Sequence, residues 1–216
     1  MTSALTLTHL GHSCVLLEFS TGTRVLLDPG AYGPSLSDIA AVDAVVVTHA
    51  HPDHLDLDHL AQVTATSGAI PLFGAPDVAE LVREAGVEFH AVEEGGFSIG
   101  SVDVTAVLTT HEQLYPGVPL PINYGFVFAG RVFAPGDSLS AVPVDADVLL
   151  APLGAPWMKL SEGIDYVRRM AARTVIPIHD AGLAPVHRAL HRMLLANFAP
   201  EGTTVTTLDV LEQIEL

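Results

Sequence analysis

The chain has 216 residues, 49% of them hydrophobic, which is enough to bury the core of a single domain over 1–216 and excludes a disordered chain. Its 25 acidic residues outnumber nine Lys and Arg, and the net charge of −16 disfavours nucleic acid and anionic membranes as partners. A single cysteine excludes an internal disulfide, and the absence of a signal-peptide pattern or a membrane-spanning apolar stretch predicts a cytoplasmic protein.

The first half of the chain is dominated by short apolar runs that are typical of strands. In chain order, we expect a β-hairpin over 13–19 and 23–27, a buried strand at 44–47, a helix at about 56–62, a helix at 77–85 and a strand at 101–108. Asp77 is the candidate N-cap of the second helix.

The second half mixes strands with longer helical patterns. In chain order, we expect two strands within 124–133, a strand at 148–151, a helix at 161–173, a strand at 174–178 and a helix at 185–197. Strands alternate with helices in both halves, which predicts an α/β fold with sheet in the middle and helices outside.

Histidine or aspartate follows several of the apolar strands. The relevant stretches are V-L-L-D at Asp28, V-V-V-T-H-A-H, V-L-T-T-H, V-F-A-P-G-D and V-I-P-I-H. Functional sites of sheet proteins gather at the carboxyl ends of strands, so these side chains are expected at one edge of the sheet.

The stretch T-H-A-H-P-D-H-L crowds four metal-binding side chains into six residues. Alternate residues of an extended segment point the same way, so His49 and His51 reach one ion together. Asp53 and His54 follow the proline and are displaced toward a second ion. Neither ion is complete with two ligands. His111 is the candidate to complete the first site and His179 the second, and Asp137 has two oxygens with which to bridge them.

These residues resemble the metallo-β-lactamase fold superfamily. The match is H-x-H-x-D-H at 49–54, followed in order by His111, Asp137 and His179, and it spans nearly the whole chain. The N-terminal H-L-G-H-S, with His12, is similar to the branch of small bacterial hydrolases related to ascorbate-6-phosphate lactonase. The resemblance implies a four-layer αββα sandwich and two divalent metal ions, with zinc as the first choice and manganese or iron as alternatives.

The resemblance also assigns individual roles. It gives His49, His51 and His111 to metal 1, Asp53, His54 and His179 to metal 2, and Asp137 to both. It places Asp28 beneath the centre as a hydrogen-bond partner of a metal-binding histidine.

Two close cations stabilise a bridging hydroxide near neutral pH, which predicts hydrolysis by attack of that hydroxide. Asp53 and His12 are the catalytic candidates: Asp53 would orient the nucleophile, and His12 would donate to the substrate or orient a ligand. Two loops leave the same edge, and they supply the substrate-pocket candidates Tyr115, Asn123, Trp157 and Lys159.

We therefore predict a metal-dependent hydrolase that acts on a lactone or another small ester. The alternatives are a phosphodiesterase or a glyoxalase-type thioester hydrolase of the same fold, and a non-enzymatic metal-binding or redox partner protein. The predicted partner is a small molecule, without nucleic acid or membrane, and the apolar excess is compatible with a homo-oligomer. The natural substrate, the metal and the oligomeric state are not determined by the sequence.

Overall fold

The computed structural model describes residues 4–216, and its strands form two seven-stranded sheets. The first sheet consists of β1 (Leu5–Gly11), β2 (Cys14–Phe19), β3 (Arg24–Leu27), β4 (Ala44–Val47), β5 (Pro71–Gly74), β6 (Glu88–Ala91) and β14 (Gln213–Glu215). The second consists of β7 (Gly95–Ile99), β8 (Val102–Thr109), β9 (Asn123–Phe128), β10 (Val132–Ala134), β11 (Val148–Pro152), β12 (Thr174–Ile178) and β13 (Thr204–Val205). The helices are α1 (Leu57–Ser67), α2 (Val78–Val82), α3 (Leu160–Met170) and α4 (Pro185–Phe198).

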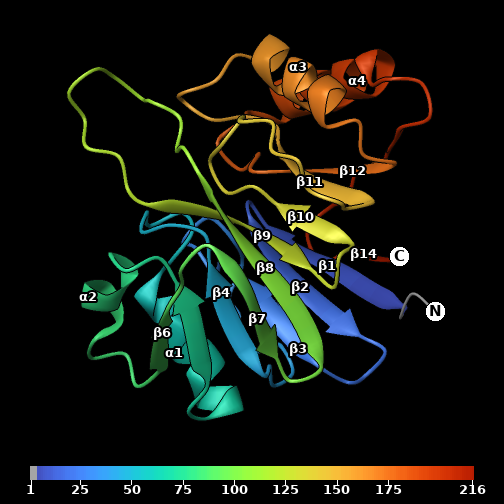
Figure 1. The fold of residues 1–216 in the computed structure, drawn as a ribbon. Helices are drawn as coiled ribbons and strands as arrows, with labels where there is room; N and C mark the ends of the chain where they lie inside the picture. The colour runs from blue at the N-terminus through green and yellow to red at the C-terminus, as the bar shows by residue number, and fades with distance from the viewer. Residues whose placement is uncertain (1–3) are drawn as a thin grey trace.

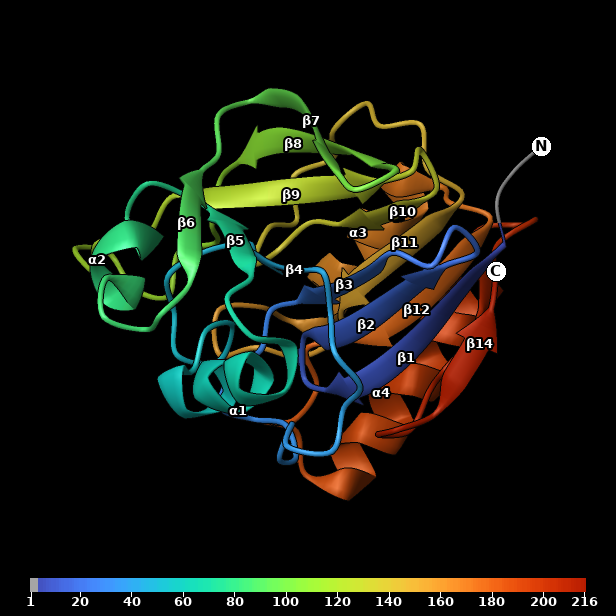
Figure 2. The same cartoon turned by 90° about the horizontal axis from the view of Figure 1, so that it is seen from below.

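The helices lie on the outer sides of the two sheets. In Figure 1, α3 and α4 lie together beside β11 and β12, whereas α1 and α2 lie on the opposite side of the molecule near β4 and β6. Figure 2 shows the same layers from below, with the two sheets between the helices. This is the predicted αββα sandwich. Within residues 4–216, no helix is both long and apolar enough to cross a membrane.

Each sheet combines antiparallel and parallel strands. The first has the order β14-β1-β2-β3-β4-β5-β6, with β3 to β6 parallel, and the second has the order β13-β12-β11-β10-β9-β8-β7, with β10 to β13 parallel. Because neighbouring parallel strands end at the same edge of a sheet, the residues that follow them are brought close together.

Strand β9 of the second sheet is buried on both of its faces. Phe126 and Phe128 pack into the core between the two sheets, whereas Val127 packs with Tyr166 of α3 and Leu195 of α4. A strand covered on both faces reads as a continuous apolar run rather than an alternating one. These two cores hold both sheets in place and leave the strand ends free to carry polar groups.

All the predicted strands and helices are present, with shifted boundaries. Helix α1 continues to Ser67, beyond the predicted end at 62, and α2 ends at Val82 rather than at 85. Asp77 is the N-cap residue of α2, as predicted, but its side chain makes no cap hydrogen bond and instead accepts from the Ile122 N–H of a distant loop. The short edge strands β6, β7, β13 and β14 were not predicted, nor were β1 and β5.

Candidate metal centre

The predicted ligands meet at one edge of the sandwich, where the two sheets approach each other. They come from the segments after four strands: 49–54 after β4, His111 after β8, Asp137 after β10 and His179 after β12. His12, a catalytic candidate, joins them from the β1–β2 turn. A hydrogen bond of 3.0 Å from the Tyr124 N–H to the Thr48 carbonyl joins the two sheets at this edge.

The first group of candidate ligands contains His49, His51, His111 and Asp137, whose ligand atoms all lie within 4.8 Å of one another. Nδ1 of His51 lies 3.1 Å from Nε2 of His49 and 3.2 Å from Nε2 of His111. Ligand atoms of a tetrahedral zinc site with bonds of about 2.0–2.1 Å are separated by about 3.3–3.4 Å. The spacing of the three nitrogens therefore suits a single small cation.

The second group contains Asp53, His54 and His179, together with His12. Nε2 of His179 lies 3.6 Å from Oδ2 of Asp53, and Nε2 of His12 lies 3.2 Å from the same oxygen. The structure thus brings together the residues that the sequence assigned to metal 2, and it adds His12 to their immediate surroundings.

Asp137 lies between the two groups and turns one oxygen toward each. Its Oδ1 is 3.1 Å from Nε2 of His54 and 3.2 Å from Nε2 of His179. Its Oδ2 is 3.6 Å from Nε2 of His111 and 4.0 Å from Nε2 of His49. This is the position that the sequence predicted for a bridging carboxylate.

Three of these atoms are buried without a hydrogen bond: Nε2 of His54, Nε2 of His179 and Oδ1 of Asp137. Buried polar atoms are nearly always paired, so a cluster of three that converge without pairing indicates a missing common partner. Imidazole nitrogens and carboxylate oxygens suit zinc, manganese and iron. The residues present therefore fit two divalent ions that share Asp137.

The other ring nitrogen of each of three histidines is fixed by an acceptor. Nδ1 of His54 donates to Asp28 Oδ2 (2.7 Å), and the carbonyls of Glu112 and Gly154 accept from Nδ1 of His111 (2.7 Å) and His179 (3.0 Å). These contacts assign the protons to Nδ1 and direct the Nε2 lone pairs into the centre. Asp28 lies where the resemblance placed it.

Thr48 supports the same network and was not predicted from the sequence. Its hydroxyl donates to Asp28 Oδ2 (2.8 Å), so its oxygen accepts from Nδ1 of His49 (3.1 Å). Its N–H donates to Asp28 Oδ1 (2.8 Å). The available signal was its place between a buried strand and the H-x-H motif.

His12 also has an assigned tautomer. Its Nδ1 accepts from the Ala181 N–H (3.3 Å), so Nε2 carries the proton and donates it to Asp53 Oδ2 (3.2 Å). Burial lowers the pKa of His12, which favours this neutral form. The structure therefore places an N–H donor beside Asp53, in agreement with the proximity to the centre that the sequence suggested.

The two groups differ in their electrostatics. Burial lowers the pKa of His49 and of His51. Burial also opposes the charged form of His179, but Asp137 outweighs this cost and raises its pKa to about 9. The pKa of His54 is raised well above its ordinary value, because Asp137 and Asp28 outweigh burial in the same way. A bound cation competes with protons for the nitrogens of the second group.

The two carboxylates of the centre are held ionised. Burial alone would raise the pKa of Asp137, but the charges of His54 and His179 hold it well below its usual range. The pKa of Asp53 is likewise lowered, because the hydrogen bond from His12 and the nearby His179 and His54 rings outweigh its partial burial. Both carboxylates are therefore available as anionic ligands.

The backbone around the centre adopts conformations that most residues avoid. Asp28, His12 and His179 have positive φ angles of 45°, 52° and 57°, and such residues concentrate at functional sites. Gly30 permits a close approach of the loop after β3, because a Cβ there would lie 1.8 Å from the Asp53 carbonyl oxygen. Only glycine lets this loop lie directly against the segment that carries Asp53.

Of the four predicted pocket residues, Trp157 reaches the centre, with its Nε1 donating to Asp137 Oδ2 at 3.0 Å. Asn123 is buried and has a structural task. Its Oδ1 accepts from the Asp137 N–H (3.1 Å), and its Nδ2 donates to the Pro135 carbonyl (2.9 Å). Asn123 therefore fixes the turn that carries Asp137 instead of facing a substrate.

Tyr115 and Lys159 make no contact with the candidate ligands. Tyr115 is 71% exposed in the loop after His111, and the Lys159 side chain is 83% exposed and lies 3.8 Å from Glu162. The pocket residue that sequence reasoning missed is Tyr32, whose ring centroid lies 5.1 Å from that of His12. Its position in the loop after Asp28, at a strand end, was the signal available.

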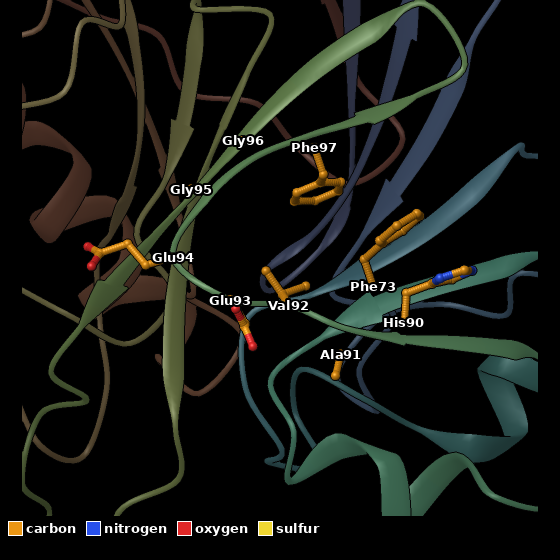
Figure 3. Close-up of a pocket in the computed structure, with 9 residues that line it drawn as sticks. All are labelled: Phe73, His90, Ala91, Val92, Glu93, Glu94, Gly95, Gly96 and Phe97. Carbon is orange, nitrogen blue, oxygen red and sulfur yellow. The ribbon is translucent and has the colours of Figure 1, made fainter.

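A hollow of about 330 Å³ opens beside the second group, and it is lined by His12, Tyr32, Asp53, Gly154, Ala155, Pro156, His179, Gly182 and Leu183. A larger hollow of about 440 Å³ lies at β6 and β7, where Phe73 and Phe97 stack with centroids 4.8 Å apart (Figure 3). The larger hollow shares no residue with the metal centre. The smaller hollow is the candidate substrate space because candidate ligands line it.

The chain belongs to the β-lactamase superfamily, whose domain model matches residues 6–179. The matched region contains all seven predicted ligands, and the αββα architecture agrees with it. The resemblance to the metallo-β-lactamase fold superfamily is therefore confirmed, whereas the lactonase-like branch stays a prediction.

Relatives in several organisms share this fold. Protein Rv0786c of Mycobacterium tuberculosis is 35% identical over 93% of this chain and 99% of its own length. A UPF0173 metal-dependent hydrolase of Enterococcus faecalis is 27% identical over 78% of this chain and 83% of its own length. The solved structure of Igni18, a metallo hydrolase of Ignicoccus hospitalis, has a TM-score of 0.74 at 18% identity, covering 99% of this chain and 98% of its own. At that identity the likeness shows the fold alone.

Proposed function

We propose that this protein is a metal-dependent hydrolase with a dinuclear centre that acts on a small ester or lactone. The observation that carries the proposal is the pair of ligand groups that share Asp137, with two buried nitrogens and one buried oxygen converging without hydrogen bonds of their own. The metal-dependent hydrolases among the relatives support the same class. Zinc is the first choice for both ions, with manganese or iron as alternatives.

When bound, two divalent ions would activate water near neutral pH and polarise the substrate oxygen. His49, His51 and His111 would hold one ion and Asp53, His54 and His179 the other, with Asp137 contacting both. The remaining tasks belong to the chain. Asp53 orients the attacking water, since its carboxylate lines the hollow. His12 lines the same hollow, and its Nε2–H donates to Asp53 Oδ2 and so holds the Asp53 carboxylate in place.

The choice of an ester over a phosphoester rests on charge. No lysine or arginine lines the hollow, so the protein offers no side-chain cation for several phosphate charges. The net charge of −16 also opposes a long nucleic-acid substrate. A small neutral carbonyl compound is the substrate that these surroundings favour.

The test is hydrolysis by protein reloaded with zinc or manganese, using a lactone, a phosphodiester and a thioester, with Asp137→Asn as the blank. We expect turnover of the lactone that is lost in the blank, while circular dichroism shows that both proteins are folded. Preferential turnover of the phosphodiester or the thioester would replace the proposed substrate class. Turnover that persists unchanged in the blank would overturn the assignment of the centre.

A further inference from the structure

The walls of the hollow beside the metal centre carry no charged side chain above its base. Apart from His12, Asp53 and His179 at its base, it is lined by Tyr32, Ala155, Pro156, Leu183 and two glycines. These residues come from the loops after β3, β11 and β12. Tyr32 is 59% exposed, so apolar surface of its ring remains open to solvent at the mouth of the hollow.

The position of Leu183 is set by the chain opposite. A Cβ at Gly154 would lie 2.6 Å from Cγ and Cδ1 of Leu183, so glycine is required for this side chain to lie against the end of β11. The Gly154 carbonyl also accepts from Nδ1 of His179. Gly154 therefore helps to position both the apolar Leu183 side chain and the candidate metal ligand His179.

The arginines of α4 and the only lysine lie beside carboxylates that do not line the hollow. Arg192 and Arg188 point to the buried carboxylate of Asp180, at 3.1 and 3.5 Å. Asp180 thus pairs with both arginines. The exposed Lys159 lies beside Glu162. An anionic group in the hollow would lose water without gaining a side-chain partner, which is unfavourable.

The hollow that Trp157 lines does not favour an anionic group either. It has a volume of about 320 Å³ and is lined by Glu112, Glu162, Asp165, Arg169, Leu139 and Trp157. Three carboxylates outnumber one guanidinium, and Arg169 donates to the Leu139 carbonyl (3.1 Å). This hollow therefore also disfavours negatively charged substituents.

We propose that the hollow lined by Tyr32 and Leu183 selects substrates that carry a small, uncharged, apolar group next to the scissile bond, and that it rejects anionic ones. This inference rests on the proposed hydrolase function and deepens it by naming the substrate class. An apolar group gains by leaving water against Tyr32, Pro156 and Leu183. The volume of about 330 Å³ is at the lower end for ligand pockets, which limits the size of the group.

The test compares two esters of matched length, phenyl butyrate and monophenyl succinate, which end in a methyl group and a carboxylate. We expect the metal-loaded wild type to favour phenyl butyrate by about tenfold or more in kcat/KM. Leu183→Lys, which places a cation in the hollow, should shift this ratio toward the succinate by a similar factor. Leu190→Lys is the matched control, because Leu190 is exposed on α4 and does not line the hollow.

Binding gives a second readout that does not need turnover. The corresponding anilides, N-phenylbutyramide and N-phenylsuccinamic acid, can be titrated against the fluorescence of Trp157, the only tryptophan. We expect tighter binding of the butyramide and a reversal in Leu183→Lys. The inference would be overturned if wild type, Leu183→Lys and Leu190→Lys all gave the same ratio between the apolar and the anionic compound, for the esters and for the anilides. The proposed hydrolase function would still stand. Anilide selectivity without ester turnover would support the hollow and count against the proposed reaction.

Discussion

The two ligand groups of the centre are supported in different ways. The first has His111 held by a backbone carbonyl and faces Trp157, whose ring centroid lies 6.4 Å from that of His111. The second is backed by the charge of Asp28 and opens onto the hollow. In the first group, His49 and His111 thus donate to neutral acceptors, whereas in the second His54 donates to the buried carboxylate of Asp28.

The comparison indicates that substitutions should separate the two groups. A change at the carboxylate they share should affect both, a change behind the second should affect mainly that one, and changes at the periphery should have smaller effects. The predictions below follow this order.

Asp137→Asn is expected to have the largest effect. The amide lacks the negative charge and the second acceptor oxygen that both groups face, so we expect turnover to fall by at least about 100-fold and bound metal to fall below two ions per chain. Metal content can be measured by elemental analysis alongside kcat. Two tightly held ions with undiminished turnover would show that Asp137 does not join the groups.

Asp28→Asn should weaken the second group more than the first, because Asp28 contacts His54 directly and His49 only through Thr48. Asp28 accepts from the Thr48 N–H, the Thr48 hydroxyl and His54 Nδ1, and an amide with one acceptor oxygen turns an N–H toward one of these donors. We expect about 10–100-fold weaker binding of one of the two ions, with the other retained. Competition with a chelator measures the two affinities.

The exposed carboxylate Asp38 provides the matched control for that experiment. Asp38→Asn makes the same change in charge without touching the centre, so both ions should bind as in the wild type. Equal weakening of both ions in Asp28→Asn would contradict the separation of the two groups.

Trp157→Phe should have a moderate effect through the first group. The change removes the N–H that donates to Asp137 Oδ2 while keeping an aromatic ring. A hydrogen bond to a charged group contributes about 1.5 kcal/mol, so we expect about tenfold lower kcat with two ions still bound. An unchanged kcat would show that the indole N–H does not position Asp137.

Much of the fold was predictable from the sequence because the central strands are short apolar runs. The strand predicted at 174–178 is β12 in the structure, and the hairpin of β2 and β3 lies within one residue of its predicted bounds. Edge strands were missed for a physical reason. β6 is a four-residue edge strand whose ends, Glu88 and Ala91, are exposed, and only its pairing with β5 defines it.

The candidate site was predictable where ligands follow strands and unpredictable where distant loops meet. The H-x-H-x-D-H spacing indicates which residues share an ion, and the structure brings them together. No local pattern shows that Gly30 must pass the Asp53 carbonyl, or that Tyr32 packs near His12. Asn123 was expected in the pocket because of its loop, yet its amide is consumed by backbone groups around Asp137.

Lys159→Ala should have the smallest effect, although this residue is the only lysine and was a pocket candidate. Its side chain is 83% exposed and its contact with Glu162, at 3.8 Å, is an exposed ion pair of the kind that contributes little. We expect kcat/KM for neutral and anionic esters to stay within about twofold of the wild type, because losing this exposed ion pair should change the activation free energy by less than about 0.4 kcal/mol. A selective loss for the anionic ester would mean that the Lys159 ammonium reaches the substrate. It would contradict the conclusion that no side-chain cation serves the hollow beside the second ligand group.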